Sequence, residues 1–225
     1  MPDLLIIVPT RGRPGNALRL IRAVEALREL DTDVFLGVDE DDPERPAYGK
    51  LAGEKFSCKV PVTVKPRMGL ADWTNYAARH YAGEYPFLAS FGDDHVPRTR
   101  GFDRKLVRAI KEMGGTGFSY PHDGAREDVP EAVVMSSDIV RALGWMCVPG
   151  LEHYFIDDAW GNLGRHAGCL RYLRAVAVDH VRGGTDATYS AASGKLAADM
   201  EAYHAWRAGQ MSRDIEVIRK LRAAA

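Results

Sequence analysis

Short apolar runs alternate with amphipathic segments along this chain, and this alternation is the feature that most limits its fold. Leu4–Val8 is the first such run, and Val34–Val38 and Phe87–Phe91 follow it. Continuous apolar runs of this length are typical of strands buried on both faces. Between the first two runs, apolar residues three apart predict a helix from Asn16, its N-cap, to about Leu30. Strands that alternate with helices predict an α/β sandwich, in which helices flank a mixed, mostly parallel sheet.

The rest of the chain continues this pattern and ends in a helical tail. Further strands are predicted over residues 60–64, 117–120, 132–135 and 175–178. Further helices are predicted over residues 70–82, 102–113, 136–143 and 157–166. The tail from Ser193 to Leu221 is predicted to be helical, with an interruption around Gly209. No linker rich in Pro, Gly or Ser divides the chain, so we expect one domain over residues 1–190 and a C-terminal helical extension, residues 191–225, packed on it.

Composition excludes several classes of protein. Of the 225 residues, 46% are hydrophobic and 27% are charged, which is the balance of a folded globular protein. Leu4–Val8 is too short for a membrane span or for the core of a signal peptide, so neither is expected. Cys58, Cys147 and Cys169 are widely spaced and odd in number, as expected of reduced thiols in a cytoplasmic protein. The net charge of −1 gives no overall signature of nucleic-acid binding.

Charged side chains follow the predicted strands, and in open α/β sheets ligands bind in the loops beyond the carboxyl ends of the strands. Asp93, Asp94 and His95 follow the third apolar run, and Mg²⁺ and Mn²⁺ prefer carboxylate oxygens as ligands. A solvated turn with a capping aspartate explains these residues equally well. His180 ends another apolar strand and precedes Gly183-Gly184, a turn that lets the backbone fold over a ligand. A structural histidine is the alternative there.

Arginines and a further aspartate also lie at strand ends. Arg11 and Arg13 follow the first strand, and Arg67 precedes Gly69. Guanidinium groups at this edge suit diphosphate recognition, because they form paired, charge-assisted hydrogen bonds. Neither a P-loop pattern nor a GxGxxG fingerprint is present. Asp39 ends the second strand, where its carboxylate can accept hydrogen bonds from a ribose or a base edge. Each of these residues alone is also compatible with an ordinary surface charge.

Asp157 and Asp158 open a predicted helix. Carboxylates in a first helical turn are favoured by the helix dipole, so simple capping is one interpretation. The other interpretation is a general base, held at the mouth of a site by the rigid helix behind it. The sequence leaves both interpretations open.

In their order along the chain, these pieces resemble the GT-A glycosyltransferases, and among them the inverting, non-processive, family-2-like branch. The resemblance covers residues 4–182. The matching segments are Leu4–Pro14 (opening strand and nucleotide loop), Gly69–Gly83 and Tyr85–Asp94 (the approach to the metal motif), Leu143–Trp145 and Ile156–Gly168 (the acceptor-side segment), and His180. The metal motif followed by Pro97-Arg98-Thr99 is also similar to a compact group of transferases from phages and actinobacteria, which for a phage protein implies the host cytoplasm.

The resemblance implies a set of site residues. The donor-binding residues that it implies are Pro9, Thr10, Arg11, Arg13, Asp39, Arg67 and Asp93. It implies a Mn²⁺ or Mg²⁺ ion held by Asp94 and His180, and Asp158 as the catalytic base with Asp157 beside it. Two motifs depart from the family pattern. Gly92–His95 replaces a plain Asp-x-Asp, which leaves the roles of its two aspartates open, and Asp157-Asp158 stands where the family usually has Glu-Asp.

The function implied is metal-dependent transfer of a single sugar from a nucleotide-diphosphate sugar, with a UDP-sugar favoured, to an acceptor hydroxyl with inversion. The QxxRW motif and the membrane spans of processive synthases are missing. The acceptor stays open between a glycan, a small molecule, a protein side chain and a modified DNA base. The DNA base stays open because basic residues cluster over 98–108 and 213–222. A sugar-phosphate nucleotidyltransferase is one alternative, although Thr10–Pro14 has a single glycine. A non-catalytic nucleotide- or glycan-binding module on the same fold is the other.

Overall fold

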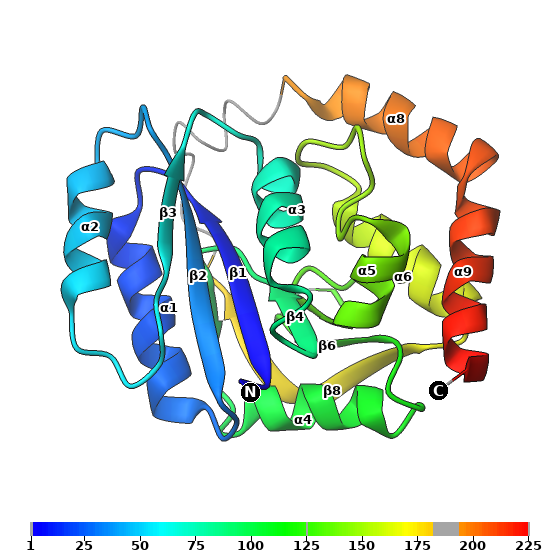
Figure 1. Cartoon of the computed structure of the whole chain (residues 1–225), viewed down its shortest axis with the longest axis horizontal. Helices are drawn as coiled ribbons and strands as arrows, with labels where there is room; N and C mark the ends of the chain where they lie inside the picture. Colours follow the sequence, from blue (N-terminus) through cyan, green and yellow to red (C-terminus); the bar gives the residue numbers. More distant parts are fainter. Residues whose placement is uncertain (1, 125, 182–193, 225) are drawn as a thin grey trace.

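The computed structural model describes residues 2–124, 126–181 and 194–224, and its central feature is an eight-stranded sheet (Figure 1). The strands are β1 Leu4–Thr10, β2 Thr32–Asp39, β3 Val62–Lys65, β4 Phe87–Ser90, β5 His95–Pro97, β6 Phe118–His122, β7 Val133–Ser136 and β8 Leu170–His180. They lie side by side in the order β3-β2-β1-β4-β7-β6-β8-β5. The predicted α/β fold with a mixed, mostly parallel sheet is confirmed.

The half of the sheet that contains β3, β2, β1 and β4 is parallel throughout. β1 lies at its centre and is almost completely buried, as its continuous apolar run predicts. The strand extends to Thr10, beyond the predicted end at Val8, and so it includes Pro9. Pro9 is tolerated because β1 pairs with β4 only as far as Ile7, and the amide hydrogen that proline lacks would point to this unpaired side.

The other half of the sheet mixes directions. β7 is antiparallel to both β4 and β6, while β8 is parallel to β6 and then pairs with β5 in the antiparallel sense. Sequence patterning did not predict the short strand β5, whose register sets His95 opposite His180. Ser90, the last residue of β4, pairs with Val133, the first residue of β7. The start of β7 and the end of β8 therefore reach the edge where the parallel strands end.

Helices cover both faces of the sheet, so each face has its own hydrophobic core (Figure 1). The helices are α1 Pro14–Leu27, α2 Arg45–Gly53, α3 Leu70–Tyr81, α4 Phe102–Lys111, α5 Ser137–Leu143, α6 Ile156–His166, α8 Leu196–Gly209 and α9 Met211–Ala224. Ile6 of β1 joins the core with Leu106 of α4, and Ile7 joins the core with Trp73 of α3 and Trp160 of α6. Within the described residues, no helix is both long and apolar enough to cross a bilayer.

The first helix differs from its predicted bounds. α1 begins at Pro14 and ends at Leu27, with Arg13 at the N-cap position, so the prediction of a helix capped by Asn16 and reaching Leu30 is wrong. Proline suits the first helical position, because its φ is already close to the helical value and its missing N–H would have no partner within the helix.

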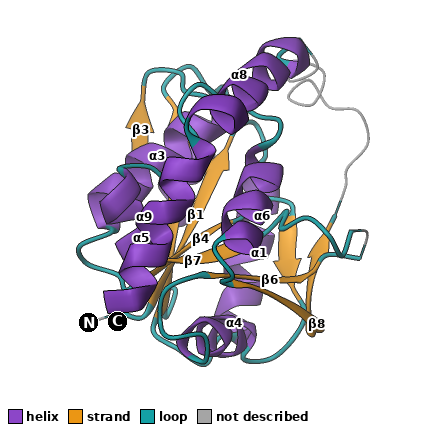
Figure 2. Cartoon of the chain, turned by 90° about the vertical axis from the view of Figure 1, so that its right-hand side faces the viewer, coloured by secondary structure: helices purple, strands orange, loops and turns teal. Residues whose placement is uncertain are grey.

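The helical tail is confirmed and consists of two helices, α8 and α9, separated at Gln210. Figure 2 shows α9 beside α5. Four side chains of the tail are buried in the same core as α3, α5 and α6: Tyr203, Trp206, Ile215 and Ile218. The predicted domain boundary between residues 190 and 191, the predicted helix start at Ser193 and the predicted Gly183-Gly184 turn lie outside the described residues.

Candidate functional site

The loops that follow β1, β2 and β4 come together at one edge of the sheet, as the sequence predicts. Thr10 Oγ1, at the end of β1, donates a hydrogen bond of 2.7 Å to Asp93 Oδ2, which follows β4. Arg11 Nη1 donates a hydrogen bond of 3.0 Å to Asp39 Oδ2, at the end of β2. Three segments that are far apart in the chain are thus joined by direct side-chain contacts.

The loop after β1 is held in place by α2, which the sequence did not predict because few of its residues are buried. Tyr48 of α2 is fully buried, and its Oη lies 3.0 Å from Thr10 Oγ1 and accepts the Arg13 amide at 2.8 Å. Burial raises the pKa of Tyr48 to about 12, so it remains a neutral phenol. Gly12 has a φ of 69°, and its amide donates to Asp42 Oδ2 at 2.8 Å. The loop therefore has fixed contacts on both sides.

Asp39 is buried, and the protein itself occupies much of its carboxylate. Its Oδ1 accepts the Met68 amide at 3.0 Å and the Trp73 Nε1–H at 2.9 Å, while its Oδ2 accepts Arg11. Trp73 reaches Asp39 by lying against Gly37, where an added Cβ would come within 2.6 Å of the indole ring. Asp39, which the sequence assigns to the nucleoside, therefore also fixes α3 and the segment before it.

The three arginines proposed from sequence for the diphosphate point in different directions. Arg11 Nη1 lies 2.5 Å and Arg67 Nη1 lies 3.8 Å from carboxylate oxygens of Asp41, so these two gather beside the loop after β2. Arg13 turns the other way, with guanidinium nitrogens 3.4 and 3.8 Å from the nearest oxygens of the Asp93-Asp94 pair. The structure brings Arg13, but neither Arg11 nor Arg67, into contact with the predicted metal motif.

The two aspartates of that motif have opposite pKa shifts. Burial raises the pKa of Asp93 to about 6, although Arg13 and the hydrogen bond from Thr10 oppose this. Burial acts on Asp94 in the same direction, but the hydrogen bond from His180 and the surrounding positive charges outweigh it and lower the pKa of Asp94 to about 2. Asp94 is therefore the aspartate that remains charged at every physiological pH, as a cation ligand must.

His180 lies between two carboxylates. Its Nε2 is 3.5 Å from Asp94 Oδ2, and its Nδ1 is 2.6 Å from Glu131 Oε2. These two hydrogen bonds raise the pKa of His180 to about 9, against the effect of burial. Sequence reasoning missed Glu131, because the metal ligands were sought only at the carboxyl ends of the predicted strands. Glu131 precedes β7, and β7 runs antiparallel to β4, so the start of β7 lies at the site.

His95 is buried beside His180, with the two ring centroids 4.4 Å apart. Burial lowers the pKa of His95 to about 4, so the ring is neutral at physiological pH. The Gly92 amide donates to its Nδ1 at 2.7 Å, which assigns the ring hydrogen to Nε2. That Nε2 has no hydrogen-bond partner among the described residues. His95 therefore offers a donor and not a lone pair, although its ligand atom lies within 4.8 Å of those of Glu131 and His180.

Asp94 and His180 can hold a divalent cation. They direct a carboxylate oxygen and an imidazole nitrogen toward each other, and Glu131 bonds to the far nitrogen of the ring. With its pKa raised to about 9, His180 carries a proton between them, and a bound cation would displace that proton from Nε2. A carboxylate behind a histidine in this way fixes the orientation of the ring and is typical of metal sites in proteins. Mn²⁺ accepts both oxygen and imidazole ligands, and Mg²⁺ accepts mainly oxygen. The donor set therefore fits Mn²⁺ better than Mg²⁺, with Glu131 as the residue that orients His180.

The acid pair lies in the first turn of α6, near Glu131. Asp157 Oδ1 accepts the amide of the next residue, Asp158, at 3.0 Å, while the N-cap position itself is occupied by Phe155, which makes no side-chain cap. Burial, followed by the charges of Asp158 and Glu131, raises the pKa of Asp157 to about 6. Among the described residues, no side chain or amide donates a hydrogen bond to the Asp158 carboxylate. The structure thus uses Asp157 at the helix start and leaves Asp158 available as an acceptor.

No protein-family model matches this chain, and no curated protein matches its sequence. Solved structures match it over most of its length. The mannosyltransferase PcManGT from Pyrobaculum calidifontis, in complex with GDP-Man and Mn²⁺, aligns at a TM-score of 0.70 and 14% identity, covering 100% of this chain and 77% of PcManGT. TarS residues 1–349 from S. aureus align at a TM-score of 0.61 and 11% identity, covering 91% of this chain and 72% of the TarS chain. The same TarS fragment in complex with UDP-GlcNAc gives a TM-score of 0.60 at 13% identity, covering 90% and 69%.

This chain has the GT-A fold. The expectation drawn from the order of its sequence motifs is thereby confirmed at the level of the fold. The strand-end loops that carry the candidate site belong to the part of the chain that the PcManGT alignment covers, since that alignment includes the whole chain.

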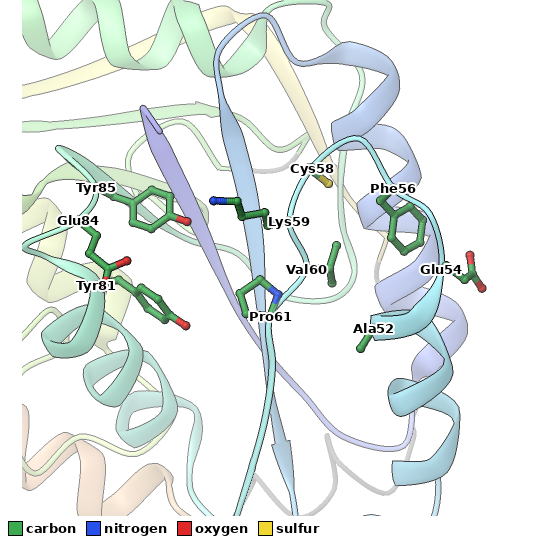
Figure 3. Close-up of a pocket in the computed structure, with 10 residues that line it drawn as sticks. All are labelled: Ala52, Glu54, Phe56, Cys58, Lys59, Val60, Pro61, Tyr81, Glu84 and Tyr85. Atoms are coloured by element: carbon green, nitrogen blue, oxygen red, sulfur yellow. The ribbon is translucent and has the colours of Figure 1, made fainter. Parts of the chain in front are cut away.

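A surface pocket of this GT-A fold lies away from the candidate site (Figure 3). Tyr81, Glu84 and Tyr85 line one side of it, and residues 52–61 line the other. Tyr85 comes just before β4, and Pro61 comes just before β3. β4 pairs with β1 in the parallel sense, and β3 does so with β2, which is itself parallel to β1. The pocket therefore lies at the amino ends of these strands, opposite the edge where the charged loops meet.

Most of the basic residues that kept a DNA acceptor open make contacts within the protein. Around α4 the ion pairs join Arg98 to Asp179, Arg100 and Arg104 to Glu29, and Arg108 to Glu112. In the tail, Arg219 and Arg222 each donate a hydrogen bond of 2.8 Å to a backbone carbonyl at the end of α6. In addition, α4 lies near the amino end of β1, at the edge opposite the candidate site (Figure 1).

Proposed function

We propose that this protein is a metal-dependent glycosyltransferase, which moves one sugar from a nucleotide-diphosphate sugar to an acceptor hydroxyl with inversion. The observation that carries the proposal is a series of contacts from Arg13 through Asp94 and His180 to Glu131, whose charge in turn acts on the pKa of Asp157 in the acid pair. The GT-A fold supports it, as do the complexes of PcManGT with GDP-Man and Mn²⁺ and of TarS with UDP-GlcNAc.

The diphosphate end of the donor site comprises Arg13, Asp94 and His180. Asp94 and His180 would hold a Mn²⁺ or Mg²⁺ ion, which would supply positive charge against the charge that develops on a leaving diphosphate. Arg13 pairs with a diphosphate oxygen through its guanidinium group, and its contacts with the Asp93-Asp94 pair place it there before the donor binds. His95 is neutral, and its buried Nε2–H forms part of the wall of the site as a hydrogen-bond donor.

The nucleoside end of the donor site lies between the loops after β1 and β2. In this proposal Pro9 and Thr10 form its wall, and Asp39 accepts a hydrogen bond from the ribose or the base at Oδ2, where Arg11 leaves one lone pair, because Met68 and Trp73 already occupy Oδ1. Arg11 and Arg67, which gather at Asp41, line this end and do not reach the diphosphate.

The acceptor side belongs to α6. Asp158 takes the proton from the acceptor hydroxyl as the hydroxyl oxygen bonds to the anomeric carbon and the bond from that carbon to the diphosphate oxygen breaks. Asp157 holds the start of the helix and remains close enough for its pKa to respond to the charge of Asp158. A rigid helix N-terminus thus carries the base, and the leaving group departs on the opposite side, which gives inversion.

We favour a UDP-sugar, with a GDP-sugar as the alternative that the PcManGT complex suggests. For the acceptor we favour a glycan or a small molecule over a modified DNA base, because the basic side chains around α4 are paired. Binding to duplex DNA that weakens steeply as salt is raised would reverse this preference, since such a slope reports contacts with phosphates.

The experiment that tests the proposal is a set of thermal unfolding curves with UDP, GDP, UDP-GlcNAc and GDP-Man, each with and without Mn²⁺. A ligand that binds only the folded state at a hundredfold excess over its Kd adds about 2.7 kcal/mol of stability. We expect one nucleotide series to raise the unfolding temperature only when Mn²⁺ is present. Asp94→Asn should abolish this shift, and Asp158→Asn should retain it. The absence of a shift with any ligand, or a shift that ignores both Mn²⁺ and Asp94→Asn, would contradict the proposal.

A further inference from the structure

A buried carboxylate of the tail holds the segment that leads into α6. Asp199, in the first turn of α8, is 1% exposed. It accepts hydrogen bonds from three consecutive backbone amides, those of Glu152 at 2.8 Å, His153 at 2.9 Å and Tyr154 at 2.7 Å. Successive amides that point inward form an anion-binding concavity, and here the protein's own carboxylate fills it. Hydrogen bonds to an ionised acceptor are also stronger than those between neutral groups.

The next residue of this segment is held by the same helix. Phe155 has a φ of 63°, and every other described residue with a positive φ is a glycine. This conformation is unfavourable unless the surroundings enforce it. The ring of Phe155 stacks on Tyr203 of α8, with centroids 5.1 Å apart and planes 14° apart. Tyr203 also accepts a hydrogen bond of 2.6 Å from Asn162 of α6. Asp199 and Tyr203 are four residues apart and therefore share one face of α8.

The same segment contacts the donor side of the site. The carbonyl of Glu152 accepts the amide of Ala71, in the first turn of α3, at 3.2 Å. Two residues further along α3, Trp73 donates to Asp39 at 2.9 Å. The amides held by Asp199 thus belong to a segment that touches both the helix with the acid pair and the helix next to the nucleoside end.

We infer that Asp199 is a positioning residue for sugar transfer, because it fixes the segment from which α6 starts and so sets where the Asp158 carboxylate meets the acceptor hydroxyl. This inference rests on the proposed function of the acid pair. Asp158 lies four residues after Tyr154, the last amide that Asp199 holds. When these amides lose their acceptor, the N-terminus of α6 gains freedom, and the base spends less time in a reactive position. Donor binding is expected to change much less, because the segment meets the donor side only through the Glu152–Ala71 hydrogen bond, and Asp39 is held directly by Arg11 and Met68.

The test measures release of nucleoside diphosphate from UDP-GlcNAc and from GDP-Man, with Mn²⁺, water as the acceptor and the full chain. Asp199→Asn preserves the shape of the side chain, but it replaces one acceptor oxygen by an NH2 group that faces amide donors. We expect kcat to fall about tenfold or more while the KM for the donor stays within about threefold. We also expect faster hydrogen exchange at the amides of residues 152–158.

Asp103→Asn is the matched control. Asp103 of α4 is also fully buried and accepts the amides of Glu29 and Leu30 at 3.0 Å each, but at the opposite edge of the sheet. This variant should speed hydrogen exchange around Leu30 and leave kcat unchanged. Tyr203→Leu provides a second route if Asp199→Asn does not fold, because it removes the ring beneath Phe155 and should also lower kcat more than it changes KM.

The possible results separate the two claims. A folded Asp199→Asn variant with wild-type kcat, or one in which only KM rises, overturns the positioning role and leaves the proposed function intact. An equal loss of kcat in Asp103→Asn also overturns it, since the effect is then one of general stability. If the wild-type protein releases no nucleoside diphosphate from either donor, the proposed function fails and the positioning role fails with it.

Discussion

At the scale of single residues, the site contains two carboxylic acids whose burial lowers the stability of the fold. Burial raises the pKa of both Asp93 and Asp157 from 3.8 to about 6. Each group therefore binds its proton more tightly in the folded protein than in the unfolded chain, so keeping it ionised at neutral pH costs stability. Carboxylates with raised pKa values are characteristic of catalytic sites, where function and stability often conflict.

Replacing Asp157 should therefore stabilise the protein. Between pH 4 and 6 the folded state holds a proton that the unfolded state has lost, so the stability contributed by Asp157 is greatest at low pH and declines as the pH rises to about 6. Asp157→Asn removes this decline, and we expect it to be more stable than the wild type at pH 7.5 by about 1–3 kcal/mol. Urea unfolding at pH 4, 5, 6 and 7.5 measures this. Equal stability at pH 7.5, or an unchanged pH dependence, would show that Asp157 is not buried in this way.

Removing the charge of Glu131 should weaken metal binding. Glu131 bonds to Nδ1 of His180 and orients its other nitrogen toward Asp94, and loss of such a partner typically lowers metal affinity about 10- to 100-fold. We expect this decrease for Glu131→Gln when Mn²⁺ is titrated in the presence of nucleoside diphosphate and free Mn²⁺ is followed by its paramagnetic resonance. Glu127→Gln, four residues earlier and half exposed, is the control and should bind Mn²⁺ as the wild type does. Equal affinities for the two variants would exclude Glu131 from the metal site.

At the scale of elements, the site depends on how α3 lies against β2. Trp73 of α3 crosses Gly37 of β2 to reach Asp39, and it can do so only because position 37 has no side chain. The short distance between the two elements therefore serves the site as well as the core. Asp39 joins them through the Met68 amide, so one carboxylate links the end of β2 to the start of α3.

Gly37→Ala should disturb both the core and the nucleoside end of the site. The added methyl group would come within 2.6 Å of the Trp73 ring, so the indole must move away from Asp39. Overpacking of this kind costs about 1–3 kcal/mol, and we expect that loss in urea unfolding together with weaker binding of nucleoside diphosphate. Gly49→Ala in α2 is the control, because nothing lies within 4 Å of its new methyl group and alanine favours helix. A Gly37→Ala protein as stable as Gly49→Ala would contradict the packing described.

At the scale of the whole molecule, the C-terminal helices and the sheet form one core. Ile218 of α9 is fully buried in the cluster that contains Ile7 of β1, and α9 also packs on α5 and α6. The tail therefore completes one face of the sheet as well as holding the start of α6 through Asp199.

Ile218→Ala tests whether the tail unfolds together with the sheet. Removing a buried isoleucine side chain to Cβ costs about 2–5 kcal/mol, and we expect that loss in a single transition that circular dichroism and tryptophan fluorescence report at the same urea concentration. Two separated transitions would mean that the helical extension unfolds on its own, against the expectation that it packs on the main domain as part of one unit.

The sequence predicted those parts of this molecule that depend on local pattern. The continuous apolar runs identified β1, β2 and β4, and the parallel arrangement then placed Thr10, Asp39 and Asp93 at one edge. It missed Glu131 and β5, because their positions follow from an antiparallel pairing that no local pattern encodes. The direction of Arg11, toward Asp41 and away from Asp94, depends on side-chain contacts in three dimensions and was equally beyond the sequence.

In the proposed function, Asp94 and His180 hold the metal ion on which donor binding depends, and Asp158 removes the proton from the acceptor hydroxyl. The most direct measurement is the rate of nucleoside diphosphate release from UDP-GlcNAc and GDP-Man, for the wild type and Asp158→Asn, with and without Mn²⁺. We expect release from one donor series only with Mn²⁺, and a rate at least about 100-fold lower for Asp158→Asn at unchanged donor affinity. Release that does not require Mn²⁺, or an Asp158→Asn variant as fast as the wild type, would contradict it.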